Sequence, residues 1–394
     1  MARILFVVPP FYGHITATLG VGDELMKRGH QVSWVSLKDI NAGYLPEGAR
    51  WIVPDAIRAR ADEVDEILQR QNEGTKLSPT DALDFGLGVT LLPFANIMND
   101  YMQQVIEEEK PDFIVHDESA FFGAIAAVKN NIPYATSITV PPGYFESKLF
   151  YPDRQELLLN KMREYQKELG ITEDKIIFNS DKLVLSFTSR ELLQPHYGDF
   201  EFEAPMAFVG ASVTGRPEPA SFDWTSLPEP NWPCIYVSIG TVLDDIRSSI
   251  FSKIIAAFKD SHFNIIANTD PALFEAWPDN FIVQKLCPQL EILERVDLVI
   301  SHGGFNTVNE ALYFNKPILA IPLAWDQSPN SDLLVKNGCG VKFRHRRLKP
   351  EVLRAAAENA MTDEVLLSNV QRISDSLRRL GGSVRAADLI EQAL

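Results

Sequence analysis

Short apolar runs alternate along the chain with segments in which apolar residues recur at helical spacing. The first run is Arg3–Val8, and an amphipathic stretch, Ile15–Arg28, follows it and ends at Gly29, a residue typical of a helix end. Gly13 and His14, between the run and the helix, predict a turn. Apolar runs of this length are typical of strands buried on both faces, and their alternation with helices predicts parallel sheets that helices cover on both sides. The fold class is therefore α/β.

The remaining runs repeat this order of strand and helix. Further strands are expected, in chain order, at Val32–Leu37, Phe113–His116, Leu183–Phe187, Ile235–Ile239, Asn264–Ala267, Phe281–Leu286, Leu298–Ser301, Ile318–Ile321 and Val341–Arg344. Further helices are expected at Gly123–Asn130, at Ile246–Lys259 and from Pro350 onward.

A proline-rich segment divides the chain. Five prolines fall within residues 211–233, which have neither helical nor strand periodicity, so this segment predicts a linker. We expect a first domain over residues 1–215, the linker over 216–231 and a second domain over 232–377. Two doubly wound domains would bind a ligand in the cleft between the carboxyl ends of their strands.

Composition excludes several classes of protein. The chain has 394 residues, with 37 Lys and Arg against 53 Asp and Glu, and its formal net charge of −16 argues against nucleic acid as a partner. A hydrophobic content of 45% is enough for a core in each domain, which excludes disorder of the whole chain. One basic run, residues 342–349, is expected to be a solvated face, although contact with an anionic membrane stays open.

The cysteines and the apolar runs indicate where the protein works. Its three cysteines, Cys234, Cys287 and Cys339, are far apart and form no C-x-x-C pair, so we expect neither a disulfide framework nor a zinc site, and a reducing cytoplasm fits best. The first apolar run stops at Pro9, too early for the core of a signal peptide, and no run of about 18 apolar residues is present. We expect a soluble protein.

The strongest motif joins a strand to a helix. The segment Leu298–Gly304, L-V-I-S-H-G-G, delivers His302 and two glycines directly to a helix N-terminus, where the sequence continues F-N-T-V-N-E. Glycines let the backbone approach a phosphate closely, the helix N-terminus favours negative charge, and His302 can donate a further hydrogen bond. Asn306 and Thr307 fall in the first helical turn, and Glu310 lies on the face of Asn306, where it could accept hydrogen bonds from two ribose hydroxyls. The segment therefore predicts a diphosphate site; the alternative is a capped helix with a solvated Glu310.

Gly20-Val21-Gly22 is a weaker phosphate signal. In a dinucleotide-binding motif the glycines lie between a strand and a helix, whereas these two lie inside the expected helix. Close packing of that helix explains them better.

His14 and Asp117 form a candidate catalytic pair. His14 follows the first strand, and Asp117 ends the parallel strand Phe113–His116, so we expect both side chains at the same carboxyl edge of the sheet. An aspartate that holds one imidazole nitrogen leaves the other free to accept a proton and stabilises the imidazolium that forms. A histidine alone in a turn is more often structural. The presence of Asp117 at the same edge favours the catalytic interpretation.

Two stretches of the sequence resemble a known family. The run from Pro288-Gln289 through S-H-G-G-F-N-T-V-N-E-A to Pro317, and then I-P-L-A-W-D-Q-S-P-N, resembles the donor-binding signature of the UDP-glycosyltransferase family of GT-B enzymes, especially its bacterial macrolide and carotenoid branch. The opening P-P-F-Y-G-H-I, with R-G-H-Q-V after it, is similar to the start of the same family. The resemblance covers most of the chain and is strongest over Phe281–Asn330 and the first fifty residues. It implies the GT-B architecture, with two Rossmann-like domains that face a cleft and a last helix, about residues 378–394, that packs on the first domain.

The resemblance also implies roles for individual residues. His14 and Asp117 match the family's catalytic pair. The donor-binding residues would be Gly13, Ser238, Gly240, Thr241, Leu286, Gln289, His302, Gly304, Asn306, Thr307, Glu310, Asp326 and Gln327. Of these, His302 would contact the diphosphate, Glu310 the ribose, and the pair Asp326-Gln327 the hydroxyls of the sugar. Leu286 stands where plant members carry a tryptophan that stacks on uracil, so uracil and thymine both stay open as the base.

The implied reaction is transfer of a hexose, with inversion, from a UDP- or dTDP-linked donor to a hydroxyl of a lipophilic small molecule. The domain 1–215 would hold this acceptor, and Phe85, Phe121, Tyr144 and Phe145 either line its site or belong to an ordinary aromatic core. No cofactor is expected, and no metal, because the chain has no Asp-x-Asp sequence. A nucleotide-sugar epimerase and a non-catalytic nucleotide-sugar-binding protein stay open as alternatives, and the sequence indicates no oligomeric state.

Overall fold

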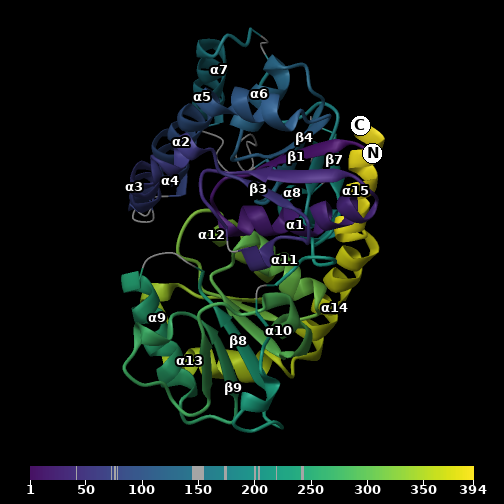
Figure 1. The fold of residues 1–394 in the computed structure, drawn as a ribbon. Helices are drawn as coiled ribbons and strands as arrows, with labels where there is room; N and C mark the ends of the chain where they lie inside the picture. The colour runs from purple at the N-terminus through teal and green to yellow at the C-terminus, as the bar shows by residue number, and fades with distance from the viewer. Residues whose placement is uncertain are drawn as a thin grey trace. The chain divides into compact units, whose positions relative to one another are not determined.

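The computed structural model describes residues 1–40, 42–71, 73–74, 77, 79–143, 155–172, 175–198, 201–202, 205–218, 220–240 and 244–394. The chain divides into two compact units, each built on a parallel sheet with helices packed against it (Figure 1). Unit 1 comprises Met1–Thr188, Asp199–Pro217 and Leu380–Leu394, and unit 2 comprises Ser189–Gly198 and Glu218–Arg379. In the described part of the chain, every helix is too short or too polar to cross a membrane.

Unit 1 contains a seven-stranded sheet in the order β3-β2-β1-β4-β5-β6-β7, with every pairing parallel. The strands are β1 (Arg3–Val7), β2 (Gln31–Val35), β3 (Arg50–Ile52), β4 (Phe113–Asp117), β5 (Tyr134–Ile138), β6 (Val184–Ser186) and β7 (Met206–Phe208). The helices are α1 (Tyr12–Lys27), η1 (Ala42–Tyr44), α2 (Asp55–Arg58), α3 (Ala61–Gln71), α4 (Pro79–Gly86), the π-helix η3 (Leu87–Leu91), α5 (Leu92–Glu109), α6 (Phe122–Lys129), α7 (Gln155–Glu168) and α15 (Gly382–Ala393).

Unit 2 contains a six-stranded parallel sheet in the order β10-β9-β8-β11-β12-β13. The strands are β8 (Cys234–Ser238), β9 (Asn264–Asn268), β10 (Phe281–Gln284), β11 (Leu298–Ser301), β12 (Ile318–Ala320) and β13 (Gly340–Lys342). The helices are α8 (Arg190–Tyr197), η4 (Trp224–Ser226), α9 (Asp244–Phe258), η5 (Pro271–Leu273), α10 (Gln289–Arg295), α11 (Phe305–Tyr313), α12 (Gln327–Lys336), η6 (His345–Arg347), α13 (Pro350–Ala360) and α14 (Glu364–Arg379).

The first strand shows why the sheet of unit 1 is covered on both faces. Side chains alternate along a strand, and on β1 Ile4 and Phe6 join a core with Leu19 of α1, while Leu5 and Val7 join a second core that includes residues of α5 and α6. All four side chains are buried. The prediction of an α/β fold with buried parallel strands is confirmed.

Two glycines of α1 serve close packing. A Cβ added to Gly22 would lie 2.2 Å from an atom of the Trp34 ring on β2, and one added to Gly20 would lie 2.5 Å from the carbonyl oxygen of Thr214. Both distances are too short for a side chain, so this helix approaches its neighbours through its glycines.

The expected turn at Gly13-His14 is wrong, because both residues lie in the first turn of α1. The chain leaves Phe11 in an extended conformation, and the N–H groups of His14 and Ile15 both donate to the Phe11 carbonyl oxygen, at 3.0 and 3.1 Å. The helix therefore begins three residues earlier than its apolar periodicity indicates, and it carries His14 on its N-terminal turn.

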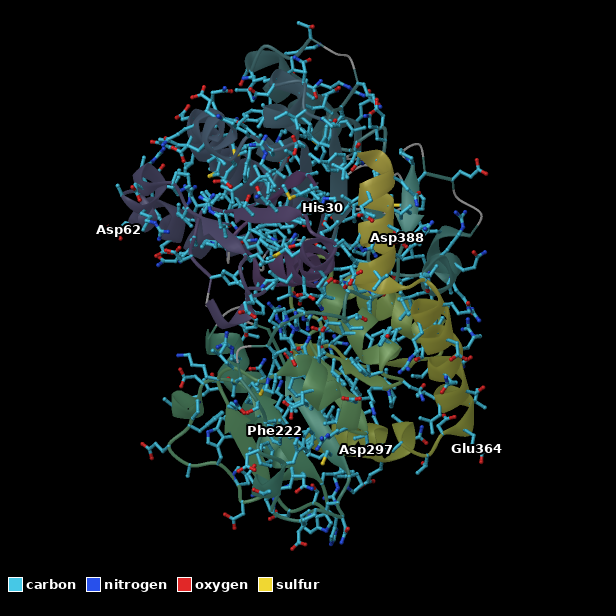
Figure 2. The ribbon with its side chains drawn as sticks, turned by 45° about the vertical axis from the view of Figure 1, so that its right-hand side comes forward. His30, Asp62, Phe222, Asp297, Glu364 and Asp388 are labelled. Carbon is cyan, nitrogen blue, oxygen red and sulfur yellow. The ribbon has the colours of Figure 1, made fainter. Side chains whose placement is uncertain are left out.

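The C-terminal helix α15 is bound to α1 by an ionic network within unit 1. Arg28 donates to Asp388 and Glu391, at 2.7 Å each, and to Glu24 at 2.9 Å, while a ring nitrogen of His30 lies 2.9 Å from Glu391 (Figure 2 labels His30 and Asp388). The segment before α15 belongs to unit 2, so the chain returns to unit 1 at its end.

One buried histidine makes the stability of unit 1 depend on pH. His116 of β4 is fully buried, and its Nδ1 donates to the Asp117 carbonyl oxygen at 2.9 Å while its Nε2 lies 2.9 Å from Thr136 Oγ1. Burial lowers the pKa of His116 to about 4, because the interior disfavours the charged ring. The neutral ring thus connects the end of β4 to β5.

We expect His116 to weaken the fold as the pH falls from 6.5 toward 4. The unfolded chain takes up the proton near pH 6.5 and the folded one only near pH 4, so the stabilisation is complete above 6.5 and is lost on the way down, by up to about 3 kcal/mol. Chemical denaturation at pH 7 and pH 4.5 measures the loss of unfolding free energy in the wild type and in His116→Gln. The wild type should lose more than the variant, and equal losses would contradict this role.

Candidate active site

A histidine and an aspartate meet at the carboxyl edge of the sheet in unit 1. β1 pairs with β4 so that Val7 lies beside His116, and the chain then continues into α1 on one side and reaches Asp117 on the other. His14 Nδ1 lies 2.9 Å from Asp117 Oδ1. The Asp117 side chain is fully buried, whereas 18% of the His14 side chain is exposed. The structure therefore brings together the two residues that the sequence predicted as a pair.

A third polar residue touches both members of the pair. Thr139 follows β5 directly, and its Oγ1 lies 2.7 Å from His14 Nδ1 and 3.1 Å from Asp117 Oδ2. Asp117 Oδ1 also accepts the N–H of Ser119 at 2.9 Å. Thr139 was not among the site residues predicted from the sequence. The signal that identified Asp117, a polar residue at the end of a parallel strand, also applies to Thr139. It was not used there because the strand β5 was not recognised.

Among the described residues, the aromatic ring that contacts His14 is that of Phe11, which was not predicted from the sequence. The Phe11 ring centre lies 5.5 Å from that of His14, and Phe94 of α5 packs behind Phe11 with its centre 6.1 Å away. Phe11 is half-buried and Phe94 is fully buried. Phe11 is thus the apolar side chain that lies against the imidazole.

Phe121, predicted as a possible acceptor contact, lies in the core of unit 1. The Phe121 side chain is buried in the core, and its ring centre lies 4.5 Å from that of Phe178 and 5.8 Å from that of Tyr165. The alternative of an ordinary aromatic core therefore holds for it. Phe85 is half-buried on α4, and Tyr144 and Phe145 lie outside the described residues.

In unit 2, two loops lie side by side at the carboxyl edge of the sheet. β11 pairs with β8 so that Ser301 lies beside Ser238, and the chain continues from these residues into His302 and toward Gly240. His302 Nδ1 lies 3.3 Å from the Ser238 carbonyl oxygen. Thr241, the next residue that the sequence placed here, lies outside the described residues.

The imidazole of His302 lies between two glycines. A Cβ added to Gly304 would lie 2.7 Å from His302 Nε2, and one added to Gly240 would lie 3.1 Å from the same atom. Gly240 also has a φ of +74°, which favours glycine. Burial lowers the pKa of His302, so the ring is neutral near pH 7. With Nδ1 donating to Ser238, Nε2 is an acceptor, and it could donate to a phosphate only after the ring takes up a proton.

The helix α11 begins directly after this loop and carries a buried carboxylate. Asn306 and Thr307 lie in its first turn, while Glu310 is only 3% exposed. Glu310 Oε2 accepts from Gln289 Nε2 at 2.6 Å, and Gln289 Oε1 in turn accepts from the Tyr236 hydroxyl at 3.2 Å. Glu310 is therefore not a solvated surface residue, and a chain of two hydrogen bonds holds its carboxylate in place.

The residue predicted beside the base, Leu286, follows β10 at the same edge of the sheet. Its side chain is 44% exposed. This exposure leaves an apolar surface on which a base could rest.

The loop before α12 is fixed by its own side chains. Gln327 Oε1 accepts the N–H groups of Leu323 and Ala324, at 2.8 and 3.0 Å, which leaves the amide nitrogen of Gln327 for a ligand. Asn330 Nδ2 donates to Asp326 Oδ2 at 2.8 Å and to the Gly303 carbonyl oxygen at 3.0 Å. Asn330, which was not predicted as a site residue, thereby joins the Asp326 loop to the His302 loop. In the described part of the chain, no group of three or more His, Cys, Asp or Glu residues is placed to hold a metal ion.

Comparison with known proteins finds a matching family model within unit 2 and glycosyltransferase relatives along the whole chain. Residues 251–377 match the glycosyltransferase family 28 C-terminal domain. The chain is 25% identical to NDP-glycosyltransferase YjiC of Bacillus subtilis, over 97% of this chain and 95% of the relative. It is 28% identical to demethyllactenocin mycarosyltransferase of Streptomyces fradiae, over 100% of this chain and 87% of the relative, and 26% identical to zeaxanthin glucosyltransferase of Pseudescherichia vulneris, over 100% and 98%.

Solved structures share the fold. The calicheamicin glycosyltransferase CalG4 has a TM-score of 0.75 and 22% identity, over 100% of this chain and 98% of its own. The glycosyltransferase VinC, solved in complex with dTDP, has a TM-score of 0.73 and 15% identity, over 99% of each chain. With its two parallel-sheet units the chain has the GT-B glycosyltransferase fold, and it is similar along nearly its whole length to bacterial macrolide and carotenoid glycosyltransferases.

Proposed function

We propose that this glycosyltransferase moves a hexose, with inversion, from a UDP- or dTDP-linked donor to a hydroxyl of a lipophilic natural product. The observation that carries the proposal is the 2.9 Å contact between His14 and the buried Asp117. Relatives are named for oleandomycin and zeaxanthin, which supports a natural-product acceptor, and VinC was solved with dTDP, which supports a nucleoside diphosphate donor.

In the proposed reaction His14 is the general base. Its Nδ1–H donates to Asp117, and its Nε2 takes the proton of the acceptor hydroxyl. The hydroxyl oxygen then bonds to the anomeric carbon as the bond from that carbon to the nucleotide's phosphate oxygen breaks on the opposite face. The nucleoside diphosphate leaves with the electron pair, the configuration inverts, and the buried carboxylate of Asp117 stabilises the imidazolium until the proton passes to water.

The donor site is proposed on unit 2. The N-terminus of α11 and the His302 loop would meet the charge that develops on the leaving diphosphate. A protonated His302 would donate from Nε2. The carboxylate of Glu310 would accept from the ribose, and Asp326 together with the amide nitrogen of Gln327 would contact the sugar. Gly13, Ser238, Thr241 and Leu286 remain proposed donor contacts.

The acceptor site is proposed beside His14 on unit 1. Phe11 offers an apolar surface within reach of the imidazole, and Phe94 supports it from behind. A flat or apolar alcohol would cover the Phe11 ring and leave its hydroxyl at His14. Phe85, Tyr144 and Phe145 remain further proposed contacts.

Transfer is favoured over the two other functions considered. The relatives are glycosyltransferases by name, and the chain keeps both His14 and Asp117 in contact, which a nucleotide-sugar-binding protein would not need. An epimerase would use no acceptor and so no base beside an apolar surface. We further propose a cytoplasmic protein that needs no cofactor and binds no nucleic acid, in line with its net charge of −16.

Replacing His14 with Ala should lower transfer to 2-naphthol by at least about a hundredfold, because this acceptor stays protonated in mildly alkaline buffer and needs a base. Transfer to 4-nitrophenol, which is ionised in the same buffer, should fall much less. Product formation from UDP-glucose and dTDP-glucose measures both rates. His30→Ala, which changes a histidine of the α15 network, serves as the control and should leave both rates near the wild type. Equal losses of transfer rate for the two acceptors, or no loss, would contradict the role of His14 as the base.

Transfer should continue in EDTA within about twofold of the untreated rate, since the proposed stabilisation of the diphosphate comes from the α11 N-terminus and His302. The assay compares untreated enzyme, enzyme dialysed against EDTA, and the same enzyme after Mg²⁺ or Mn²⁺ is restored. Activity that disappears in EDTA and returns with the metal would show that the proposal is wrong on this point.

A further inference from the structure

We propose that Thr139 is the positioning residue of the catalytic pair, and that its hydroxyl fixes both the rotamer of Asp117 and the tautomer of His14. The proposal rests on His14 being the base. The Thr139 side chain is buried, and its one oxygen contacts each of the two residues.

The direction of each hydrogen bond follows from the chemistry of the groups. A threonine hydroxyl has one hydrogen to donate, and an ionised carboxylate can only accept. The Thr139 hydrogen therefore points to Asp117 Oδ2, 3.1 Å away, and its lone pairs face His14 Nδ1, 2.7 Å away. Nδ1 must then carry the hydrogen that Thr139 Oγ1 and Asp117 Oδ1 share. Nε2 is left without a hydrogen, which is the form that can take a proton from an alcohol.

The fold holds Thr139 rigidly in this place. β5 pairs with β4 so that Ser137 lies beside Asp117, and Thr139, two residues later, points to the same face of the sheet. Thr136, on the opposite face of β5, contacts Nε2 of His116 at 2.9 Å. The end of β4 is thus connected to β5 on both faces. The branched side chain of threonine also restricts its own rotamer.

Without this hydroxyl, the pair would lose its geometry. The Asp117 side chain is buried, so Oδ2 would be left without the hydrogen bond from Thr139. An unpaired buried carboxylate oxygen is unfavourable, and the Asp117 carboxylate would rotate toward another donor. Asp117 Oδ1 would still accept from Ser119, but the imidazole would lose one of the two acceptors that fix the hydrogen on Nδ1.

Thr139→Val keeps the shape of the side chain and removes the hydroxyl. We expect kcat for 2-naphthol to fall about tenfold to a hundredfold, with a smaller loss for 4-nitrophenol and an unchanged dissociation constant for UDP or dTDP. The acid limb of the pH profile of kcat should also move. Thr139→Ser restores the hydroxyl and should recover most of the rate. Ser261→Ala removes another buried hydroxyl, which lies in unit 2 before β9, and should leave both rates unchanged.

The outcomes separate this proposal from the proposed function. Thr139 does not position the pair if the kcat of Thr139→Val for 2-naphthol stays within about threefold of the wild-type value. The same conclusion follows if Thr139→Ser and Thr139→Val lose kcat equally on both acceptors. If His14→Ala keeps its activity toward 2-naphthol, the base itself is wrong, whatever Thr139 does. Nitrogen-15 NMR tests the tautomer in the wild type, so it does not depend on the folding of a variant. A hydrogen on Nδ1 of neutral His14 supports the proposal, and a hydrogen on Nε2 overturns it.

Discussion

Parallel pairing of neighbouring strands is the constraint on which both candidate sites depend. In a parallel sheet the carboxyl ends of the strands lie at one edge, so residues far apart in sequence come together there. In unit 1 the ends of β4 and β5 bring Asp117 and Thr139 to the start of α1, which carries His14. In unit 2 the ends of β8 and β11 bring Ser238 to His302. Both candidate sites therefore follow from these pairings.

At both edges, the polar side chains are fixed by other protein groups before any ligand binds. Asp117 accepts a hydrogen bond from Ser119, and Glu310 accepts one from Gln289. The His302 ring packs so closely against Gly240 and Gly304 that neither position has room for a side chain. Burial makes each of these hydrogen bonds costly to break, because a polar group without a partner is penalised in the interior. Such preorganisation is what stabilises charge that develops during a reaction, since no group has to reorient at that moment.

The sequence predicted the parts of this arrangement that depend on local pattern. Apolar runs identified β1, β4, β8 and β11, and the residues after them supplied His14, Asp117 and His302. β5, Y-A-T-S-I, was missed because its polar residues interrupt the apolar run, and their hydrogen bonds to neighbouring segments exist only in the folded chain. Without β5, Thr139 had no predicted place. Phe11 and Phe121 show the same limit, since sequence alone does not tell which aromatic ring is buried in the core and which lies against the imidazole.

The most direct test of the account is calorimetric titration of UDP and dTDP into the wild type, Glu310→Ala and Gly304→Ala. Gly88→Ala is the matched control, because a Cβ there meets no atom within 4 Å and the residue lies in unit 1. We predict that the wild type and the control bind at least one of the two nucleotides, and that Glu310→Ala and Gly304→Ala bind it at least about tenfold more weakly, through loss of the carboxylate and displacement of the His302 ring. Binding that both variants leave unchanged, or a wild type that binds neither nucleotide, would contradict the donor site on unit 2.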